Sequence, residues 1–268
     1  MADLGAEFEE RPDDLEEQPR TLEEVKAEQR ALLRAAYEHS RPIAEIEAES
    51  DKLVAEAAGF DTLIPGIHNK LWFSQKLEES AELARRTNGT FTVVMGDLDL
   101  FKQLNDTAGH PEGDNTLRRI GAVLLRNTRK TDTVARYGGD EFVILFQNTT
   151  ALQTLIPLVR ILNTIPEQSS RHPRTGEMIP LGISIGIAQF NNADPDETAS
   201  SVLAAADVAL YSVKNSTKGR ICLTTNDPTF TSETMFNQLN TLTISPRQPE
   251  RKPEIIKDIM AKTTLRHR

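Results

Sequence analysis

Two pairs of acidic residues have the types and spacing for metal chemistry, and the first of them ends an apolar run. Asp97 and Asp99 close the segment 91–99, which reads FTVVMGDLD. Side chains alternate along a strand, so residues two apart project from the same face. Carboxylates at the exit of a buried strand offer the oxygen ligands that Mg²⁺ prefers. Asp99 is also placed to cap a helix expected through Phe101 and Leu104.

The second pair belongs to the sequence RYGGDEF, in which two predicted strands are joined by Gly138 and Gly139. Consecutive glycines are a hairpin signal, and they let the backbone come close to a ligand. Asp140 and Glu141 follow at once. If this hairpin pairs beside the strand of Asp97, the carboxylates of Asp97 and Asp140 meet around one or two metal ions. Such a site polarises a phosphate and helps to ionise a hydroxyl nucleophile.

Hydrophobic periodicity predicts the elements that would position these residues. Beyond the helix near Leu104, the predicted helices cover 71–86, 115–129, 152–165 and 196–214, and the predicted strands cover 91–98, 133–137, 141–147, 179–190 and 220–223. Pro157 should mark an early turn or kink in the third of these helices. The order of elements predicts an α/β (α+β) domain, in which helices cover a central, mostly antiparallel sheet.

The flanks of this domain differ from it in composition. Residues 1–20 read as a disordered acidic tail, and 225–268 as a mostly disordered polar and basic tail, on either side of 21–60 and a main domain over 61–224. Apolar residues in 21–60 follow an a/d heptad spacing, which Pro42 interrupts. This spacing is typical of a short coiled coil that pairs two protomers. It is equally typical of one or two amphipathic helices that fold back on their own domain.

Composition narrows the possible partners. The formal net charge of −9 argues against binding to bulk DNA or RNA, because nucleic-acid-binding proteins normally carry a basic footprint. The single cysteine excludes a disulfide within the chain. The N-terminus lacks the apolar stretch of a signal peptide, and no apolar run approaches the length that a bilayer requires. We therefore expect a cytoplasmic protein without a membrane anchor of its own.

Taken together, residues 95–114, which read MGDLDLFKQLNDTAGHPEGD, and residues 136–142, which read RYGGDEF, resemble the GGDEF family of diguanylate cyclases. The separated motifs agree with the family in order and in spacing. The resemblance implies a palm-like α/β fold related to polymerase and adenylyl cyclase palms. It also implies the condensation of two GTP molecules into cyclic di-GMP with release of two pyrophosphates. That reaction needs a two-fold symmetric homodimer, because each domain binds one GTP.

The resemblance assigns roles to the metal-site residues. Asp97, Asp140 and the backbone carbonyl of Leu98 would bind Mg²⁺, with Mn²⁺ as a possible substitute. Glu141 would support the metal or deprotonate the 3′-hydroxyl of GTP. Lys102, together with the backbone that precedes it, would hold phosphates and belongs to the implied catalytic set.

The resemblance also implies a substrate site and an inhibitory site. Asn105 and Asp114 would read the guanine edge, since a carboxylate can accept hydrogen bonds from both N1–H and N2–H. Arg129 and Asp132 match the RxxD pattern of the family's inhibitory product site, where an arginine can fork to a phosphate. The remaining residues implied to bind GTP are Leu100, Phe101, Gly138, Gly139, Lys214 and Arg220.

Two departures from the family pattern leave other functions open. Residues 62–70 read TLIPGIHNK where the family has Asp-x-Leu-Thr-Gly-Leu-x-Asn-Arg, so Thr62 and Pro65 replace the Asp and the Thr. Lys214 and Arg220 are also farther apart than usual. The alternative function is a catalytically silent GGDEF domain that senses cyclic di-GMP or GTP and signals by protein contact. A third is a nucleotidyl cyclase with another base preference, against which Asp114 argues.

Overall fold

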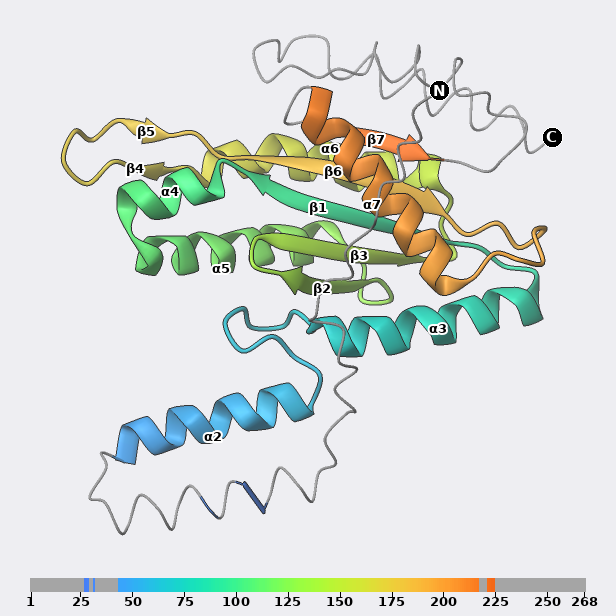
Figure 1. The fold of residues 1–268 in the computed structure, drawn as a ribbon, viewed down its shortest axis with the longest axis horizontal. Coiled ribbons are helices and arrows are strands. Elements are labelled where there is room, and N and C mark those ends of the chain that lie inside the picture. The colour runs from blue at the N-terminus through green and yellow to red at the C-terminus, as the bar shows by residue number, and fades with distance from the viewer. Residues whose placement is uncertain (1–26, 29–30, 32–42, 217–220, 225–268) are drawn as a thin grey trace, which may run out of the picture. The chain divides into compact units, whose positions relative to one another are not determined.

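The computed structural model of the chain describes residues 27–28, 31, 43–216 and 221–224 (Figure 1). The chain divides into two compact units, Met1–Ala58 and Gly59–Arg268. In the first unit, helix α2 covers Ile43–Ala57. The pairing of this segment with a second protomer stays a prediction, and the two predicted tails lie outside the described residues. Among the described helices, none combines the length and the apolar character that crossing a bilayer requires.

The second unit is built on a five-stranded sheet with the strand order β2-β3-β1-β6-β7. The strands are β1 (Phe91–Asp99), β2 (Thr133–Gly138), β3 (Glu141–Gln147), β6 (Gly182–Gln189) and β7 (Ile221–Thr224). All neighbouring pairs are antiparallel except β6 and β7. The central strand β1 is buried along its whole length. The predicted fold class, a mostly antiparallel sheet covered by helices, is confirmed.

Helices cover both faces of the sheet, and each face has its own apolar cluster. Helices α3 (Lys70–Thr87) and α7 (Ala199–Ser216) cover one face, and Figure 1 shows α7 crossing in front of the strands. Helices α4 (Phe101–Ala108), α5 (His110–Asn127) and α6 (Ala151–Thr164) belong to the other face. The alternation of side chains in β1 and β6 divides the apolar residues between these two layers.

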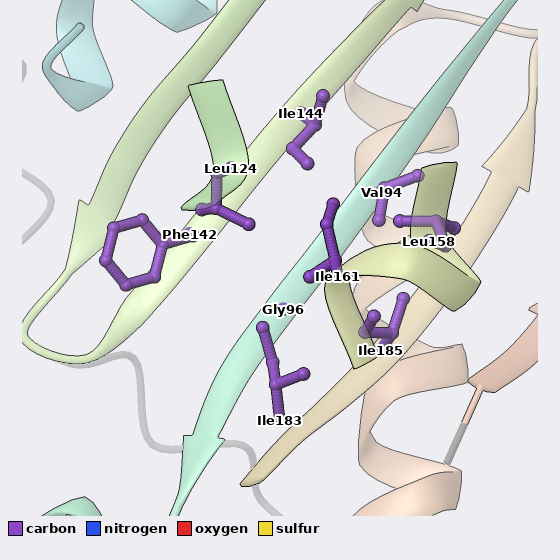
Figure 2. Close-up of a pocket in the computed structure, with 9 residues that line it drawn as sticks. All are labelled: Val94, Gly96, Leu124, Phe142, Ile144, Leu158, Ile161, Ile183 and Ile185. Atoms are coloured by element: carbon purple, nitrogen blue, oxygen red, sulfur yellow. The ribbon is translucent and has the colours of Figure 1, made fainter. Parts of the chain in front are cut away.

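The layer between the sheet, α5 and α6 is tightly packed. It encloses a cavity of about 10 Å³, which Figure 2 shows surrounded by aliphatic and aromatic side chains. The lining residues are Val94, Gly96, Leu124, Phe142, Ile144, Leu158, Ile161, Ile183 and Ile185. A cavity of this size holds one water molecule at most, and this one offers no polar partner. It therefore belongs to the core and is no ligand site.

Two details of the elements differ from the sequence prediction. The predicted strand 179–190 is divided, because β5 ends at Ile179 and β6 starts at Gly182, after Pro180, which has no N–H to donate. The short strand β4 (Ser170–Arg171) pairs with β5 (Met178–Ile179) in a separate hairpin that the sequence did not predict. Helix α6 runs through Pro157 without an early turn, and a kink at Pro157 stays a prediction. The 3₁₀ turn η1 (Ile165–Gln168) follows α6.

The segment 59–69, which we call the lead-in segment, extends the sheet edge at β2. The His68 N–H donates to the Val134 carbonyl at 3.0 Å, and the Arg136 N–H donates to the His68 carbonyl at 2.9 Å. At the end of the segment, the Asn69 side chain caps α3 by accepting from the Trp72 N–H at 2.9 Å. The lead-in segment therefore belongs to the folded domain and fixes the start of α3.

Candidate active site at the β1–β3 edge

The register of β1 and β3 brings the two acidic pairs together. Asp97 lies directly opposite Glu141, and the Leu98 N–H donates to the Asp140 carbonyl at 3.3 Å. Asp97 is buried, whereas Asp140 and Glu141 are half-buried. The hairpin thus pairs beside the strand of Asp97. The sequence analysis required this pairing for the two acidic pairs to form one site.

The charges at this edge are unbalanced. Burial, followed by repulsion from Asp97, raises the pKa of Asp140 and of Glu141 above the ordinary carboxyl values. Among the described residues, two cations partly offset the three carboxylates: the Lys214 ammonium lies 2.5 Å from Asp97 Oδ2, and the Arg136 guanidinium lowers the raised pKa of Asp140 in part. Lys214 comes from α7, and its charge lowers both raised pKa values in part. The cluster therefore attracts further positive charge.

This donor set suits a divalent cation that is shared with a substrate. Within the described part of the chain, no three Asp, Glu, His or Cys side chains are arranged around one ion position. Mg²⁺ commonly takes only one or two carboxylates from a protein and completes its octahedron with water and substrate phosphates. Asp97 and Asp140, supplemented by a backbone carbonyl, match that pattern. The surplus negative charge of the carboxylates would attract the ion.

Asp99 does not cap a helix, which corrects the sequence prediction. It is the last residue of β1, is buried, and accepts a hydrogen bond from Ser184 Oγ at 2.8 Å. Because β1 extends this far, Leu100 takes the N-cap position of α4 with φ of 65° and no side-chain cap. A non-glycine residue with positive φ stores strain, and such residues gather at ligand sites. Leu100 begins the loop to which the resemblance assigns phosphate binding.

The residues expected to read guanine lie around the start of α5. Asn105 Oδ1 is buried, and no hydrogen-bond partner for it exists among the described residues. It lies against Gly113, where a Cβ would overlap this oxygen. Asp114 follows in the first turns of α5 and is exposed, as is Lys102 on α4. A buried acceptor without a hydrogen-bond partner destabilises the fold. The Asn105 amide oxygen can therefore accept a hydrogen bond from a ligand.

A guanidinium holds the Gly-Gly hairpin, and sequence reasoning missed its acidic partner. Arg136 donates to the Gly139 carbonyl through Nε at 2.9 Å and through a terminal nitrogen at 2.7 Å. Its other terminal nitrogen pairs with Asp61 Oδ2 at 3.5 Å. Asp61 also accepts from the N–H groups of Leu63 and Ile64 at 2.9 and 2.7 Å.

These contacts correct the reading of the lead-in segment. Asp61 supplies the aspartate of the family's Asp-x-Leu pattern, to which Thr62 had been matched, and Leu63 follows at the expected spacing. Pro65 is then one extra residue before Gly66. The triplet Asp-Thr-Leu at residues 61–63 fits the start of the family pattern. It is missed when residues 62–70 are matched to that pattern without a gap.

The RxxD residues form a tight turn ahead of β2. Asp132 Oδ2 accepts from the Arg129 N–H at 2.8 Å, while the Arg129 side chain is exposed. Asp132 Oδ1 is buried and makes no hydrogen bond to any described residue. Asp132 therefore stabilises the turn, the Arg129 side chain is exposed, and the inhibitory role of the pair stays a prediction. Arg220 lies outside the described residues.

Comparisons with known proteins agree with this geometry. Residues 58–220 match the family described as "Diguanylate cyclase, GGDEF domain". Diguanylate cyclase A of Treponema denticola is 37% identical over 138 residues, which are 52% of this chain and 36% of that protein. Response regulator PleD of Caulobacter vibrioides is 32% identical over 162 residues, 59% of this chain and 34% of that protein. The chain thus spans about a third of the length of these curated relatives.

Solved structures share the fold. The GGDEF domain of DgcB from Caulobacter crescentus, in complex with c-di-GMP, superposes with a TM-score of 0.57 at 29% identity, covering 62% of this chain and 95% of that one. Diguanylate cyclase SiaD of Pseudomonas aeruginosa, in complex with its activator SiaC, gives a TM-score of 0.57 at 27% identity, covering 75% of each chain. Because the family match extends over more than half of its length, the chain belongs to the diguanylate cyclase GGDEF domain family.

Proposed function

We propose that this chain condenses two molecules of GTP into cyclic di-GMP and releases two pyrophosphates. The observation that carries the proposal is the meeting of Asp97, Asp140 and Glu141 at one edge of the sheet, with Lys214 on Asp97. Nearby segments add the strained Leu100 and the buried, unpartnered oxygen of Asn105. A cation site beside a phosphate loop and a base-reading pocket is what a nucleotidyl transfer requires.

The proposed roles follow from the chemistry of each group. Asn105 and Asp114 would hold the guanine edge, while the backbone at Leu100 and the Lys102 ammonium would hold phosphate oxygens. Asp97 and Asp140, with the Leu98 carbonyl, would hold Mg²⁺ or Mn²⁺. When bound, the ion supplies charge neutralisation at the α-phosphate. Lys214 would exchange its bond to Asp97 for the substrate's phosphates once the ion compensates the carboxylates.

Glu141 is the group best suited to take a proton from the reacting hydroxyl. Its raised pKa makes its carboxylate a stronger base than an ordinary glutamate. The 3′-oxygen of one GTP would attack the α-phosphorus of the other, and the bond from that phosphorus to the pyrophosphate oxygen breaks. Two such steps close the ring. The two GTP molecules must face each other, so we propose a two-fold symmetric homodimer of half-sites.

A product assay tests the proposal. Purified protein is incubated with GTP and Mg²⁺, and the products are identified by mass, with Asp140→Asn as the inactive control. Cyclic di-GMP that forms with the wild type and vanishes in the control would support the cyclase. Product binding without turnover, by a protein shown to be folded and dimeric, would favour the catalytically silent sensing domain instead.

Replacing Arg129 with Ala is expected to remove inhibition by product and to leave the initial rate unchanged. The physical reason is that Arg129 is the exposed, forked donor of the RxxD turn and comes from a different segment than the carboxylates. Progress curves of cyclic di-GMP formation should stay linear in Arg129→Ala but level off in the wild type. Lys130→Ala, which changes the neighbouring exposed cation, should behave as the wild type does. Levelling-off that persists in Arg129→Ala would contradict an inhibitory site here.

A further inference from the structure

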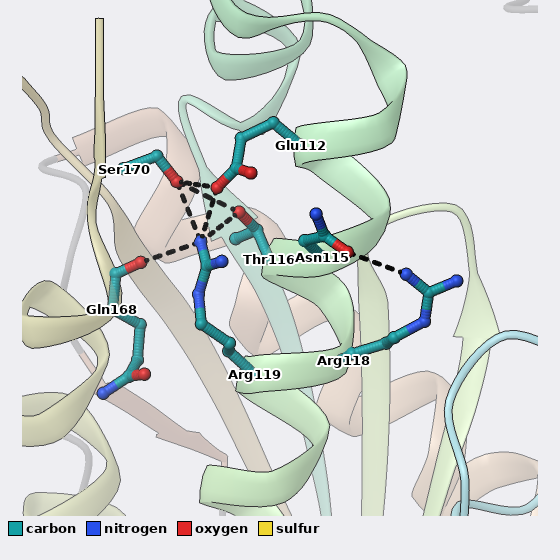
Figure 3. A network of polar contacts seen from close by, with 7 residues as sticks. All are labelled: Glu112, Asn115, Thr116, Arg118, Arg119, Gln168 and Ser170. Carbon is teal, nitrogen blue, oxygen red and sulfur yellow. Dashed lines mark hydrogen bonds and ion pairs between the residues drawn. The ribbon is translucent and has the colours of Figure 1, made fainter.

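A cluster of polar side chains joins the first turns of α5 to the β4–β5 hairpin, and the proposed reaction makes no use of it. Figure 3 shows the cluster, which we call the Glu112 cluster and which consists of Glu112, Thr116, Arg119, Ser170 and the Gln168 carbonyl. Glu112 Oε1 accepts from Ser170 Oγ at 2.6 Å and from Arg119 at 3.0 Å. Arg119 also donates to Thr116 Oγ1 at 2.7 Å and to Ser170 Oγ at 2.8 Å.

Burial strengthens the bonds of the two hydroxyl groups in the cluster, whereas the side chains of Arg119 and Glu112 are 36% and 31% exposed. Thr116 is fully buried and Ser170 is 7% exposed, so their hydroxyl groups depend on partners inside the cluster. The Ser170 hydroxyl, followed by Arg119, lowers the pKa of the Glu112 carboxyl, which therefore stays ionised at neutral pH. Hydrogen bonds to charged groups are the stronger kind. Glu112 is thus fixed in place from both α5 and the hairpin.

The first turn of α5 has no capping side chain, so Glu112 is its side-chain link to the β4–β5 hairpin. Gly109 occupies the N-cap position and makes no side-chain hydrogen bond to the helix. A helix start normally depends on a capping side chain to satisfy its free N–H groups. Here the position of the turn is instead set by Glu112, through its bond to Ser170 on the hairpin.

This anchored turn also packs against Asn105, the residue proposed to read the base. Gly113 follows Glu112 directly, and it is packed so closely on the Asn105 side chain that a Cβ would overlap the amide oxygen. Asp114 comes next in the same turn. A displacement of the turn therefore changes the surroundings of Asn105 and the position of Asp114 together.

We propose that Glu112, Arg119 and Ser170 are positioning residues that anchor the first turn of α5 to the β4–β5 hairpin and thereby set the selectivity for guanine. The inference rests on the proposed function, because it assigns the pocket of Asn105 to a guanine base. It adds that base selectivity depends on a hairpin whose residues lie outside the recognisable motifs.

Three variants isolate the anchor. Ser170→Ala removes the hydroxyl that bridges the hairpin to Glu112, while Ser170→Thr keeps a hydroxyl there. Thr175→Ala is the matched control in the same hairpin, since Thr175 is exposed and bonds only locally, to Glu177. Each protein is first shown to be folded and dimeric to the same extent as the wild type.

The measurement is the dissociation constant for GTP and ATP analogues that carry a methylene group between the α- and β-phosphates and do not react. Ser170→Ala should weaken binding of the GTP analogue about tenfold, because a displaced Asp114 would lose the equivalent of one hydrogen bond between its carboxylate and the guanine edge. Binding of the ATP analogue should change little, so the preference for guanine falls by a similar factor. Ser170→Thr should recover most of the preference, and Thr175→Ala should retain all of it.

Hydrogen exchange at the amides of residues 112–114 supplies a second readout that needs no nucleotide. These amides should exchange faster in Ser170→Ala than in Thr175→Ala. A Ser170→Ala protein that loses affinity for both analogues equally, or that keeps the full preference for guanine, would overturn the inference. A wild-type protein that binds neither analogue would instead overturn the proposed function, so the two failures are distinguishable.

Discussion

Asp140→Asn is expected to abolish cyclic di-GMP synthesis while it makes the metal-free domain more stable. The carboxylate is a proposed ligand of an ion that lowers the reaction barrier by several kcal/mol, so activity should fall by about 10³-fold or more. The same carboxylate is destabilising without the ion, because burial and the charge of Asp97 raise its pKa. The asparagine side chain has nearly the same shape as aspartate and no charge. It therefore avoids both the burial of a charge and the repulsion by Asp97.

The direction of the pH dependence follows from the raised pKa. A folded-state pKa above the unfolded value means that the folded protein binds more protons in the interval between the two. The stabilising contribution of Asp140 is therefore complete below its unfolded pKa and is lost as the pH rises through its folded pKa. The stability gained by Asp140→Asn should be largest at neutral pH, should shrink as the pH falls through the raised folded-state pKa of Asp140, and should be absent below the ordinary pKa of an aspartate.

Thermal unfolding in excess chelator measures this difference. We expect Tm to rise at pH 7, and each ~1 kcal/mol of added stability corresponds to about 2–4 °C in a domain of this size. Asp196→Asn is the matched control, because Asp196 is an exposed aspartate in the loop before α7. An Asp140→Asn protein that is inactive but no more stable would show that the site carries no electrostatic strain, and would contradict our account of why it recruits a cation.

Gly139→Ala should leave the fold intact and yet remove most of the activity. No atom lies within 4 Å of a Cβ built at Gly139, and Gly139 is not among the residues with positive φ. Neither sterics nor backbone conformation within this chain therefore requires glycine there. If the hairpin contacts the substrate through its backbone, a methyl group at this position meets the ligand instead.

Gly186→Ala on strand β6 provides the opposite case, a glycine that the packing of the protein requires. A Cβ at Gly186 would overlap the backbone of α7 at Ala206 and Leu210, so the helix must move away from the sheet. Overpacking of this kind costs about 1–3 kcal/mol. Thermal melts and GTP turnover should be measured for both variants. Gly139→Ala should lose activity at unchanged Tm, whereas Gly186→Ala should lower Tm. A Gly139→Ala protein with full activity would rule out close approach of GTP to this turn.

Local patterns predicted the two halves of the carboxylate cluster but not their pairing. The apolar run around Asp97 and the Gly-Gly turn before Asp140 each indicated a strand, and the hydrophobic spacing indicated the helices that cover the sheet. These features depend on residues close in sequence, so one chain read alone was enough to find them. That β1 and β3 are neighbours was only a condition in the sequence analysis, and the fold supplies it.

Features that depend on distant contacts were missed or misassigned. Asp99 looked like a helix cap, because its bond to Ser184 on another strand leaves no trace in the sequence around it. The β4–β5 hairpin has only two residues in each strand, too few for a periodic signal. The partnership of Glu112 with Ser170 joins segments that only the fold brings together, so no local pattern could reveal it.

The lead-in segment has a practical consequence for engineering the protein. It holds the edge of β2 through His68 and reaches the Gly-Gly hairpin through Asp61 and Arg136. A fragment that starts at α3 would keep every strand of the main sheet and still lose the acidic partner of that arginine. A chimera that places a foreign sensor ahead of this domain should therefore have its junction before Gly59. A junction placed inside the segment would remove or disturb the contacts of Asp61 and Arg136 that hold the Gly-Gly hairpin.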